Sequence, residues 1–247
     1  LYKPKNMSSF QAINKLKKKF FFKKIGHAGT LDPLAEGILP IALGKATKLI
    51  SMVNKDTKKY IFTITWGVQT SSDDSDGKII NKSNLIPNFE NINNKIHNYS
   101  GYIFQIPPKV SAVKVKGRRA YELARKKVDF QLTPKKVHIK NIKILEHDNN
   151  ETKFEIECGK GFYIRSLARD LSSDLGTFGH ISNLIRTKVG KFNEDSSILL
   201  DDLLKIGERQ SDINCIHSSI SMLDDILAYE IDDQLDIENL SFGRSIK

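Results

Sequence analysis

A loop near the N-terminus constrains this chain more than any other stretch. Residues 26–39 read Gly-His-Ala-Gly-Thr-Leu-Asp-Pro-Leu-Ala-Glu-Gly-Ile-Leu. Its three glycines permit backbone conformations with positive φ at no steric cost. Pro33 disfavours the α region for Asp32 and pushes that residue toward an extended conformation. The string therefore predicts a rigid loop that presents one carboxylate, Asp32, with His27 near enough to share its site.

Plainer interpretations of the same residues remain open at this point. Asp32-Pro33 is also a good start for a helix, with Asp as the cap and Pro at the first helical position. A single histidine such as His27 is more often structural than catalytic. Each pair of residues taken alone favours the plainer interpretation, whereas the complete string from 26 to 39 favours a functional site.

Composition indicates an ordinary globular protein of one large or two small domains. The chain has 247 residues, of which 39% are hydrophobic. Two cysteines, Cys158 and Cys215, cannot build a disulfide framework, so we expect a reducing, cytoplasmic setting. No apolar run approaches the length that spans a bilayer, so no membrane partner is expected.

Charge is divided unevenly along the chain. Residues 1–193 hold 35 basic and 16 acidic side chains, a net charge of +19, whereas residues 194–247 hold 4 basic and 13 acidic ones, a net charge of −9. The basic portion carries the Asp32 loop, and a strongly basic domain suits a polyanionic partner such as nucleic acid. A generic lysine-rich surface is the alternative, so charge alone supports RNA binding only weakly.

Hydrophobic periodicity predicts strands in the middle of the chain, with helices dispersed around them. The expected strands are Ile38–Leu43, Tyr60–Trp66, Val137–Glu146 and Thr152–Cys158. The expected helices are Ser8 or Ser9 to Phe20, Lys45–Val53, Asn91–Asn98, one from near Arg119, one from Arg165 to about Leu175, Leu199–Ile206 and Ile220–Leu227. This order predicts an α+β fold around a central, largely antiparallel mixed sheet flanked by helices and loops.

Two familiar ligand motifs fail on inspection. Residues 73–77, Asp-Asp-Ser-Asp-Gly, form an acidic turn. Aligned as a calcium loop, the segment around this acidic turn begins with Ser72 and ends with Ser83, where glutamate is required. A phosphate-binding loop ending at Gly44-Lys45 has six residues between its glycines in place of four, and Ala46 follows the lysine. No metal site is therefore predicted.

Several further motifs resemble one known family when they are taken together. The 26–39 string resembles the motif II region of the TruB family of pseudouridine synthases, and the remaining matches occur in the order that the family shows. They are Lys3-Pro4 with Ser8-Ser9, Lys58-Lys59-Tyr60, Gly67–Thr70 with the acidic turn after it, Pro107–Arg125, Gly161–Arg165 and His180–Arg186. Ordered motifs across roughly residues 1–205 are far more specific than any one match.

This resemblance implies catalytic roles for three residues. Asp32 would be the essential aspartate that attacks or deprotonates the target nucleoside. Arg165 would pair with Asp32 and hold it ionised and oriented. Tyr60 would stack on the target uracil. Whether it also accepts a proton, as a general base, when the ring is reattached is left open.

Substrate-binding roles follow from the same resemblance. His27 would help to displace the T-loop base and support the flipped uridine, and Tyr60 would bind that uridine by stacking. Tyr163 and Leu184 would line the uracil pocket, and Lys3 would lie beneath the site.

The resemblance also implies a fold and a reaction. Residues 1–240 would form a pseudouridine synthase domain with a thumb-like RNA-binding insertion at 105–130 and an acidic helical part at 195–240. Residues 241–247 would begin a PUA-type domain that is truncated or absent. The expected reaction is isomerisation of uridine 55 in the T loop of tRNA, without cofactor or metal, by a monomer that binds the T-stem loop.

Two rival functions remain. The related eukaryotic and archaeal synthases act within guide-RNA particles, although the string Ala120–Arg125 resembles the stand-alone bacterial type. A protein that binds or folds RNA without catalysis is the second rival, and it would have no need of Asp32 beside Tyr60 and Arg165.

Overall fold

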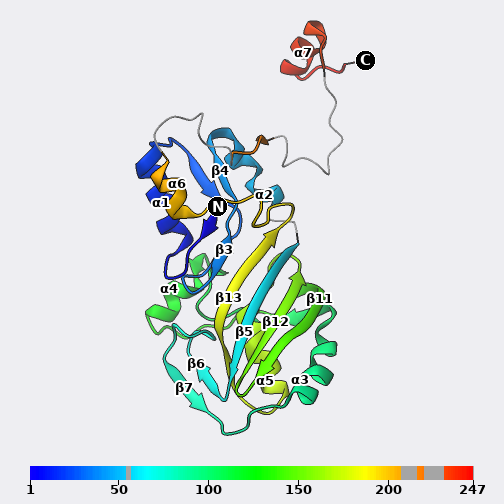
Figure 1. Ribbon diagram of the computed structural model, residues 1–247. Helices are drawn as coiled ribbons and strands as arrows, with labels where there is room; N and C mark the ends of the chain where they lie inside the picture. The colour runs from blue at the N-terminus through cyan, green and yellow to red at the C-terminus, as the bar shows by residue number, and fades with distance from the viewer. Residues whose placement is uncertain (54–56, 207–215, 220–230, 247) are drawn as a thin grey trace. The chain divides into compact units, whose positions relative to one another are not determined.

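A seven-stranded sheet forms the centre of the structure, which is a computed structural model (Figure 1). Its strands, in spatial order, are β1 (Tyr2–Lys3), β3 (Glu36–Ile38), β13 (Gly179–Val189), β5 (Lys58–Trp66), β12 (Glu151–Cys158), β11 (Lys135–Asp148) and β8 (Gly101–Gln105). All neighbours pair antiparallel except β3 and β13, which are parallel. The predicted α+β fold with a largely antiparallel mixed sheet is therefore confirmed.

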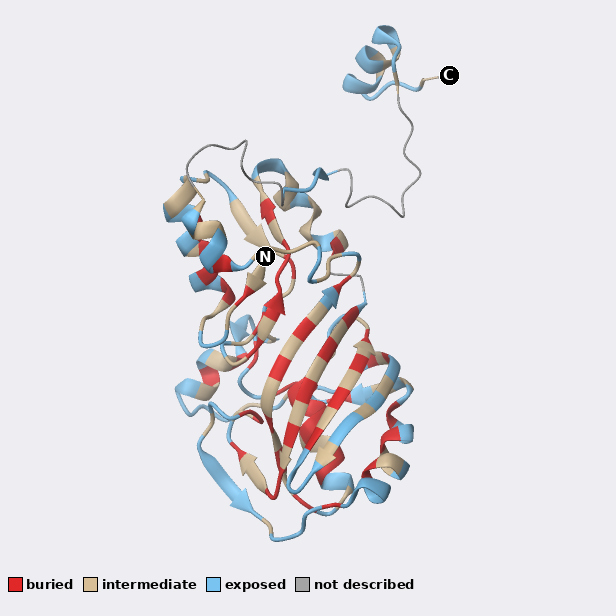
Figure 2. Ribbon diagram, viewed as in Figure 1, coloured by how far each residue is buried: buried red, intermediate tan, exposed pale blue. Residues whose placement is uncertain are grey.

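Alternation along β5 explains where the core lies. Tyr60, Phe62, Ile64 and Trp66 are buried, whereas the residues between them are only partly covered. Phe62 stacks on Phe154 of β12, with ring centroids 5.1 Å apart. Helices α3 (Phe89–Ile96) and α5 (Ile164–Asp174) add their apolar residues to this core (Figure 2). Helices therefore pack against one face of the sheet, and the residues that alternate with the buried ones in β5 face the other side, where they are only partly covered.

The N-terminal helix α1 (Ser9–Phe20) begins and ends where the sequence predicts. Ser8 accepts a hydrogen bond from the Gln11 amide, and Gln11 accepts one in return from the Ser8 amide. The helix stops at Phe21, whose φ is 53°. Its buried residues Ala12 and Leu16 pack with Leu200 of α6 (Leu200–Lys205).

The predicted strand Ile38–Leu43 is two separate strands in the structure. β3 joins the central sheet, and β4 (Ile41–Leu43) pairs with β2 (Ile25–His27) instead. Pro40 separates them, because it has no amide to donate to a ladder.

The predicted helix Lys45–Val53 begins as a 3₁₀ helix, η1 (Gly44–Leu49), and continues as α2 (Ile50–Val53). Asn91–Asn98 is likewise covered by α3 and a 3₁₀ turn, η2 (His97–Tyr99).

The segment predicted to be a thumb contains a tight hairpin followed by a helix. Strands β9 (Lys114–Val115) and β10 (Arg118–Arg119) pair antiparallel and lead into α4 (Ala120–Arg125). Both residues between the strands have positive φ, 48° at Lys116 and 84° at Gly117, which matches the turn that suits two-residue hairpins. A second small ribbon joins β6 (Val68–Thr70) to β7 (Ile79–Lys82).

The structure describes residues 1–53, 57–206, 216–219 and 231–246. Contacts divide the chain into Leu1–Cys215, which holds every predicted site residue, and Ile216–Lys247, in which α7 (Gln234–Ser241) is described. The predicted helix Ile220–Leu227 lies outside the described residues, and the predicted division at 240 stays a prediction.

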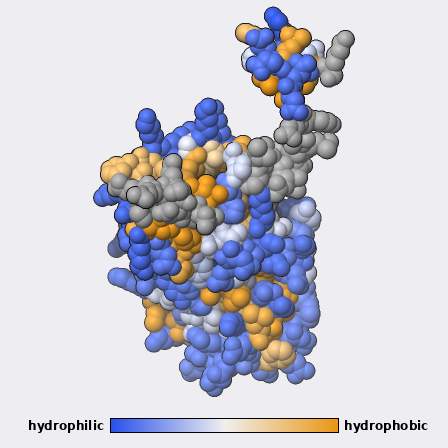
Figure 3. Space-filling model, turned by 45° about the horizontal axis from the view of Figure 1, so that its top comes forward, coloured by the Kyte–Doolittle hydropathy of each residue, from blue (hydrophilic) through white to orange (hydrophobic). Residues whose placement is uncertain are grey.

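Among the described residues, no helix has both the length and the apolar character to cross a membrane. On the face drawn in Figure 3, hydrophilic side chains surround smaller hydrophobic areas.

Candidate active site

The Asp32 loop is fixed to the start of α1 by hydrogen bonds. The Ser9 hydroxyl donates to the Leu31 carbonyl at 3.0 Å and accepts from the Leu31 amide at 2.9 Å. The Asn6 amide donates to the Pro33 carbonyl at 2.8 Å, from a residue with a φ of 59° that asparagine tolerates. No helix begins at Asp32, because a turn closed by the Ala35 amide follows it. The helix-start interpretation of Asp32-Pro33 is therefore wrong.

Asp32 forms an ion pair with Arg165, in the first turn of α5. Oδ2 of Asp32 lies 2.9 Å from Nη2 of Arg165. The Arg165 side chain is 5% exposed and the Asp32 side chain 37%, so the carboxylate faces solvent and its counter-ion does not. Arg165 also donates to the Ser72 and Val110 carbonyls, each at 3.0 Å. These contacts fix the guanidinium and orient the carboxylate that it holds.

Two buried aspartates of the acidic turn face arginines. Asp74 lies 3.5 Å from Arg165, and Asp73 lies 3.3 Å from Arg169, one turn further along α5. Burial raises the pKa of both carboxyls, and the neighbouring arginines partly oppose this. Arg165 thus sits between Asp32 and Asp74. In the part of the chain that the structure describes, no three His, Cys, Asp or Glu side chains could hold a metal ion together.

Tyr60 lies on β5 within the electrostatic reach of Asp32. Burial raises the pKa of its hydroxyl, and the positive charge of Arg186 on β13 acts in the opposite direction. Sequence reasoning did not assign Arg186 to the site. A signal was available, since Leu184 and Arg186 are two apart on one strand and both side chains are buried, and a buried arginine is rare.

Lys3 and His27 are two further site residues of the N-terminal region, and the pKa of each is lowered. Lys3 is fully buried and donates to the Pro4 and Met7 carbonyls at 2.7 and 2.6 Å. Burial lowers the pKa of Lys3 to about 8, although Asp32 and Glu36 oppose the shift. The pKa of His27, at the end of β2, is also lowered, by burial first and by the charge of Arg186 second.

Tyr163 and Leu184 come from different elements, the start of α5 and strand β13. Tyr163 is the N-cap of α5, and the side chain of Gln105 bonds both its amide and its carbonyl, at 2.8 and 3.0 Å. Asp32 and Arg165 both act electrostatically on the Tyr163 hydroxyl, whose pKa is raised mainly by burial. Leu184 belongs to the same core cluster as Tyr60. Gln105 thus holds the backbone at the start of α5, a contact that the sequence does not predict, because a lone polar residue gives no local signal of its partner.

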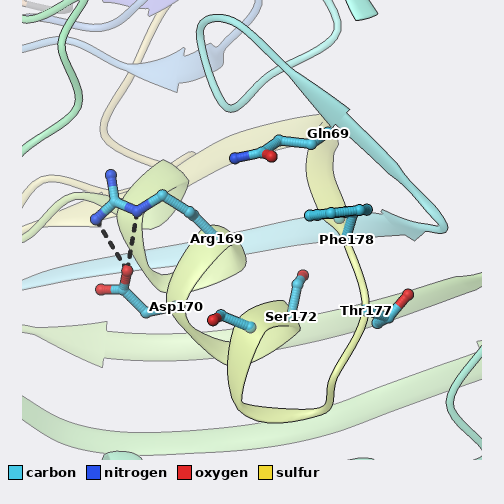
Figure 4. Close-up of a pocket in the computed structure, with 8 residues that line it drawn as sticks. Gln69, Arg169, Asp170, Ser172, Thr177 and Phe178 are labelled. Atoms are coloured by element: carbon cyan, nitrogen blue, oxygen red, sulfur yellow. Dashed lines mark hydrogen bonds and ion pairs between the residues drawn. The ribbon is translucent and has the colours of Figure 1, made fainter. Parts of the chain in front are cut away.

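A separate pocket of about 270 Å³ lies at the other end of α5 (Figure 4). Gln69, Arg169, Asp170, Phe178 and residues around them line it, and Arg169 pairs with Asp170 at 2.9 Å. None of the predicted site residues lines this pocket, so the Asp32 cluster is a distinct place on the molecule.

Comparison with known proteins matches two family models. The TruB family pseudouridylate synthase (N terminal domain) matches residues 17–164, and the tRNA pseudouridylate synthase B C-terminal domain matches residues 165–228.

Similar proteins and structures cover most of this chain. It is 50% identical over 207 residues to tRNA pseudouridine synthase B of Wolbachia pipientis subsp. Culex pipiens, covering 83% of this chain and 59% of that protein. With the Bartonella quintana protein of the same name, identity is 46% over 213 residues, covering 86% of this chain and 79% of that protein.

A Cbf5-Nop10-Gar1 crystal structure matches with a TM-score of 0.65 and 28% identity over 82% of this chain and 52% of that one. An H/ACA RNP structure bound to a substrate RNA containing 2'-deoxyuridine matches with a TM-score of 0.61 and 25% identity, covering 82% of this chain and 50% of that one. The chain thus spans about three fifths of the Wolbachia relative.

Proposed function

This chain belongs to the TruB family of pseudouridylate synthases, and we propose that it converts uridine 55 in the T loop of tRNA into pseudouridine. The observation that carries the proposal is the pair between half-exposed Asp32 and buried Arg165. It offers one oriented carboxylate to a substrate and gives that carboxylate a fixed counter-ion. A protein that only binds RNA has no use for this arrangement.

The chemistry requires little more than such a carboxylate. The bond from C1′ to N1 of uracil breaks, a bond from C1′ to C5 forms, C5 loses a proton and N1 gains one. Atoms and electrons balance without an oxidant, a reductant or a second substrate. Asp32 acts on the nucleoside as a nucleophile or as a base, and Arg165 keeps its carboxylate in position.

The surrounding residues supply a place for an extruded base. Removing a uridine from a folded loop costs on the order of a few kcal/mol. Stacking on an aromatic ring returns roughly 1–3 kcal/mol, and Tyr60 is our candidate for that ring. The ordinary pKa of a tyrosine hydroxyl is about 10, and burial raises the pKa of Tyr60 further, so Tyr60 is protonated at neutral pH. This favours stacking on the uracil over action as a general base.

The other predicted roles fit this geometry. A neutral His27 suits displacement of a base, because its lowered pKa removes the cost of inserting a charge into a stack. Tyr163 and Leu184 would line the uracil, and Lys3 would support the loop from beneath. RNA would be held by the basic surface of residues 1–193 and by the hairpin and helix of the predicted thumb. We further propose that the protein works as a cytoplasmic monomer.

A guide-dependent function is the second candidate, since one similar structure is an H/ACA RNP bound to a substrate RNA. The curated relatives at 46–50% identity are named tRNA pseudouridine synthase B, which favours tRNA as the substrate. The test is to incubate the purified chain with an unmodified T-stem-loop transcript that carries tritium at C5 of uridine. We expect tritium release without any added guide. Release that occurs only when a guide RNA is added would favour the rival, and no release in either case would contradict both.

A further inference from the structure

Arg186 is among the most deeply buried side chains of the molecule. It lies on β13 and is 1% exposed, although arginines are almost never fully buried without a partner. Within the described part of the chain, its guanidinium forms no ion pair with a carboxylate. Its Nε donates to the Ile38 carbonyl at 2.7 Å and its Nη2 to the Gly29 carbonyl at 2.9 Å. The charge is therefore satisfied by backbone oxygens.

Those two carbonyls belong to the two ends of the Asp32 loop. Gly29 precedes Asp32 by three residues, and Ile38 follows it by six. The backbones meet at the same place, because β3 and β13 pair in parallel with Gly37 opposite Arg186. A Cβ on Gly37 would come within 2.2 Å of the Arg186 carbonyl oxygen, so only glycine allows this approach. Arg186 thus closes the loop at both of its ends.

The same guanidinium reaches the aromatic side chain of the site. Arg186 and Tyr60 are partners across β13 and β5, both side chains are buried, and the charge of Arg186 acts on the Tyr60 hydroxyl. The same charge acts on His27 and Lys3. One buried side chain therefore binds the segment that holds the carboxylate and lies beside the ring expected to meet the base.

We propose that Arg186 is a positioning residue of the active site, whose guanidinium locks the two ends of the Asp32 loop to each other and to strand β13, beside Tyr60. The proposal rests on the proposed function, because it concerns the geometry of that reaction. A guanidinium suits the task, since its rigid fork offers donors in several directions at once. An ammonium at the same position is a point charge on a flexible stem and would hold the two carbonyls less rigidly.

The deciding variant is Arg186→Lys, because it keeps the charge and removes the fork. Its matched control is Thr187→Ser, an uncharged and partly covered position next to Arg186 on the same strand. Single-turnover isomerisation, affinity for the T-stem loop and amide exchange at Leu31 and Ala35 are measured for both. We expect Arg186→Lys to bind RNA within about threefold of wild type and to react at least about tenfold more slowly, because small misplacements of reacting groups are costly. The Leu31 and Ala35 amides should exchange at least about threefold faster, and the control should change none of these.

Amide exchange separates the failure of this inference from failure of the proposed function, because it needs no RNA. An Arg186→Lys protein with wild-type rate and wild-type exchange would overturn the positioning role. Faster exchange in Arg186→Lys, together with a wild-type protein that makes no pseudouridine, would reject the function but keep the positioning role of Arg186 in the loop. If Arg186→Lys does not fold, Arg186→Gln tests the same two contacts, because glutamine keeps one amide donor group in place of the fork. We expect at least about threefold faster exchange at Leu31 and Ala35 in Arg186→Gln, and unchanged exchange there would overturn the proposal.

Discussion

At the scale of single residues, the site is organised by a contrast in burial. Arg165 is almost fully covered, and Asp32, to which it is paired, is open to solvent. A second carboxylate, Asp74, touches the same guanidinium from inside the protein. The buried partner fixes the geometry, and the open one remains available to a substrate.

Lys3 gives a prediction at the same scale. Its folded-state pKa is about 8 and its ordinary value is 10.5. Between these values the unfolded chain binds one more proton than the folded chain, so the free energy of unfolding rises with pH. Across that window we expect wild type to gain about 3 kcal/mol relative to Lys3→Met. Urea unfolding of both proteins at pH 7.5 and pH 10 measures this, and a constant difference between them would refute it.

Residue identities within the site were predictable only where a motif carried them. Asp32 and Arg165 stand in strings that are distinctive in the sequence. Gln105 and Arg186 were missed because their partners are backbone groups, which a sequence does not identify, and the spacing of two between Leu184 and Arg186 was the one signal for Arg186. For Arg186 the nearest carbonyl partner along the chain is 148 residues away.

At the scale of elements, a glycine decides whether β3 can join the sheet. Gly37 has a φ of 106° and lies against the Arg186 backbone. Gly37→Ala therefore meets both an unfavourable φ and a backbone clash, and we expect it to lower the free energy of unfolding by more than about 3 kcal/mol. Gly44→Ala is the control, because Gly44 also has a positive φ, 56°, but open space around it. Chemical denaturation that shows equal losses would contradict this account of β3.

Elements with strong local periodicity were predicted well. The alternation in β5 and the cap of α1 are local signals. In β5 the aromatic and β-branched residues alternate between buried and partly covered positions, and α1 begins directly after the Ser8 cap. The division of 38–43 into two strands was not predicted, because β3 is specified by its pairing with β13, about 150 residues further along the chain. Non-local pairing of this kind cannot be detected from a window of neighbouring residues.

At the scale of the whole molecule, the uneven charge predicts how RNA binding depends on salt. Lys23 and Lys24 are exposed beyond the end of α1, and neither forms an ion pair with any described residue. Lys140 and Lys143 are also exposed, but they pair with Glu157 and Glu155 at 2.9 Å.

Replacement of both unpaired lysines by glutamine should reduce the slope of log affinity against log salt by up to about 2, since each phosphate contact contributes about 1. Lys140→Gln with Lys143→Gln is the matched control and should leave the slope unchanged. Binding titrations with tRNA over a range of salt concentrations measure both. Equal slopes for the two double variants would show that the 23–24 segment lies outside the RNA footprint.

The central claim is that Asp32 performs the chemistry and does not serve mainly to bind RNA. Its most direct test compares wild type with Asp32→Asn on the T-stem-loop transcript, measuring pseudouridine formation and RNA affinity on the same preparations. Asparagine is nearly the same size but carries no charge, so the loop and its contacts should persist. We predict that Asp32→Asn forms no detectable pseudouridine and binds the transcript within about threefold of wild type, as expected when an interaction made only in the transition state is removed. Pseudouridine formation by Asp32→Asn at a rate near that of wild type would contradict the account.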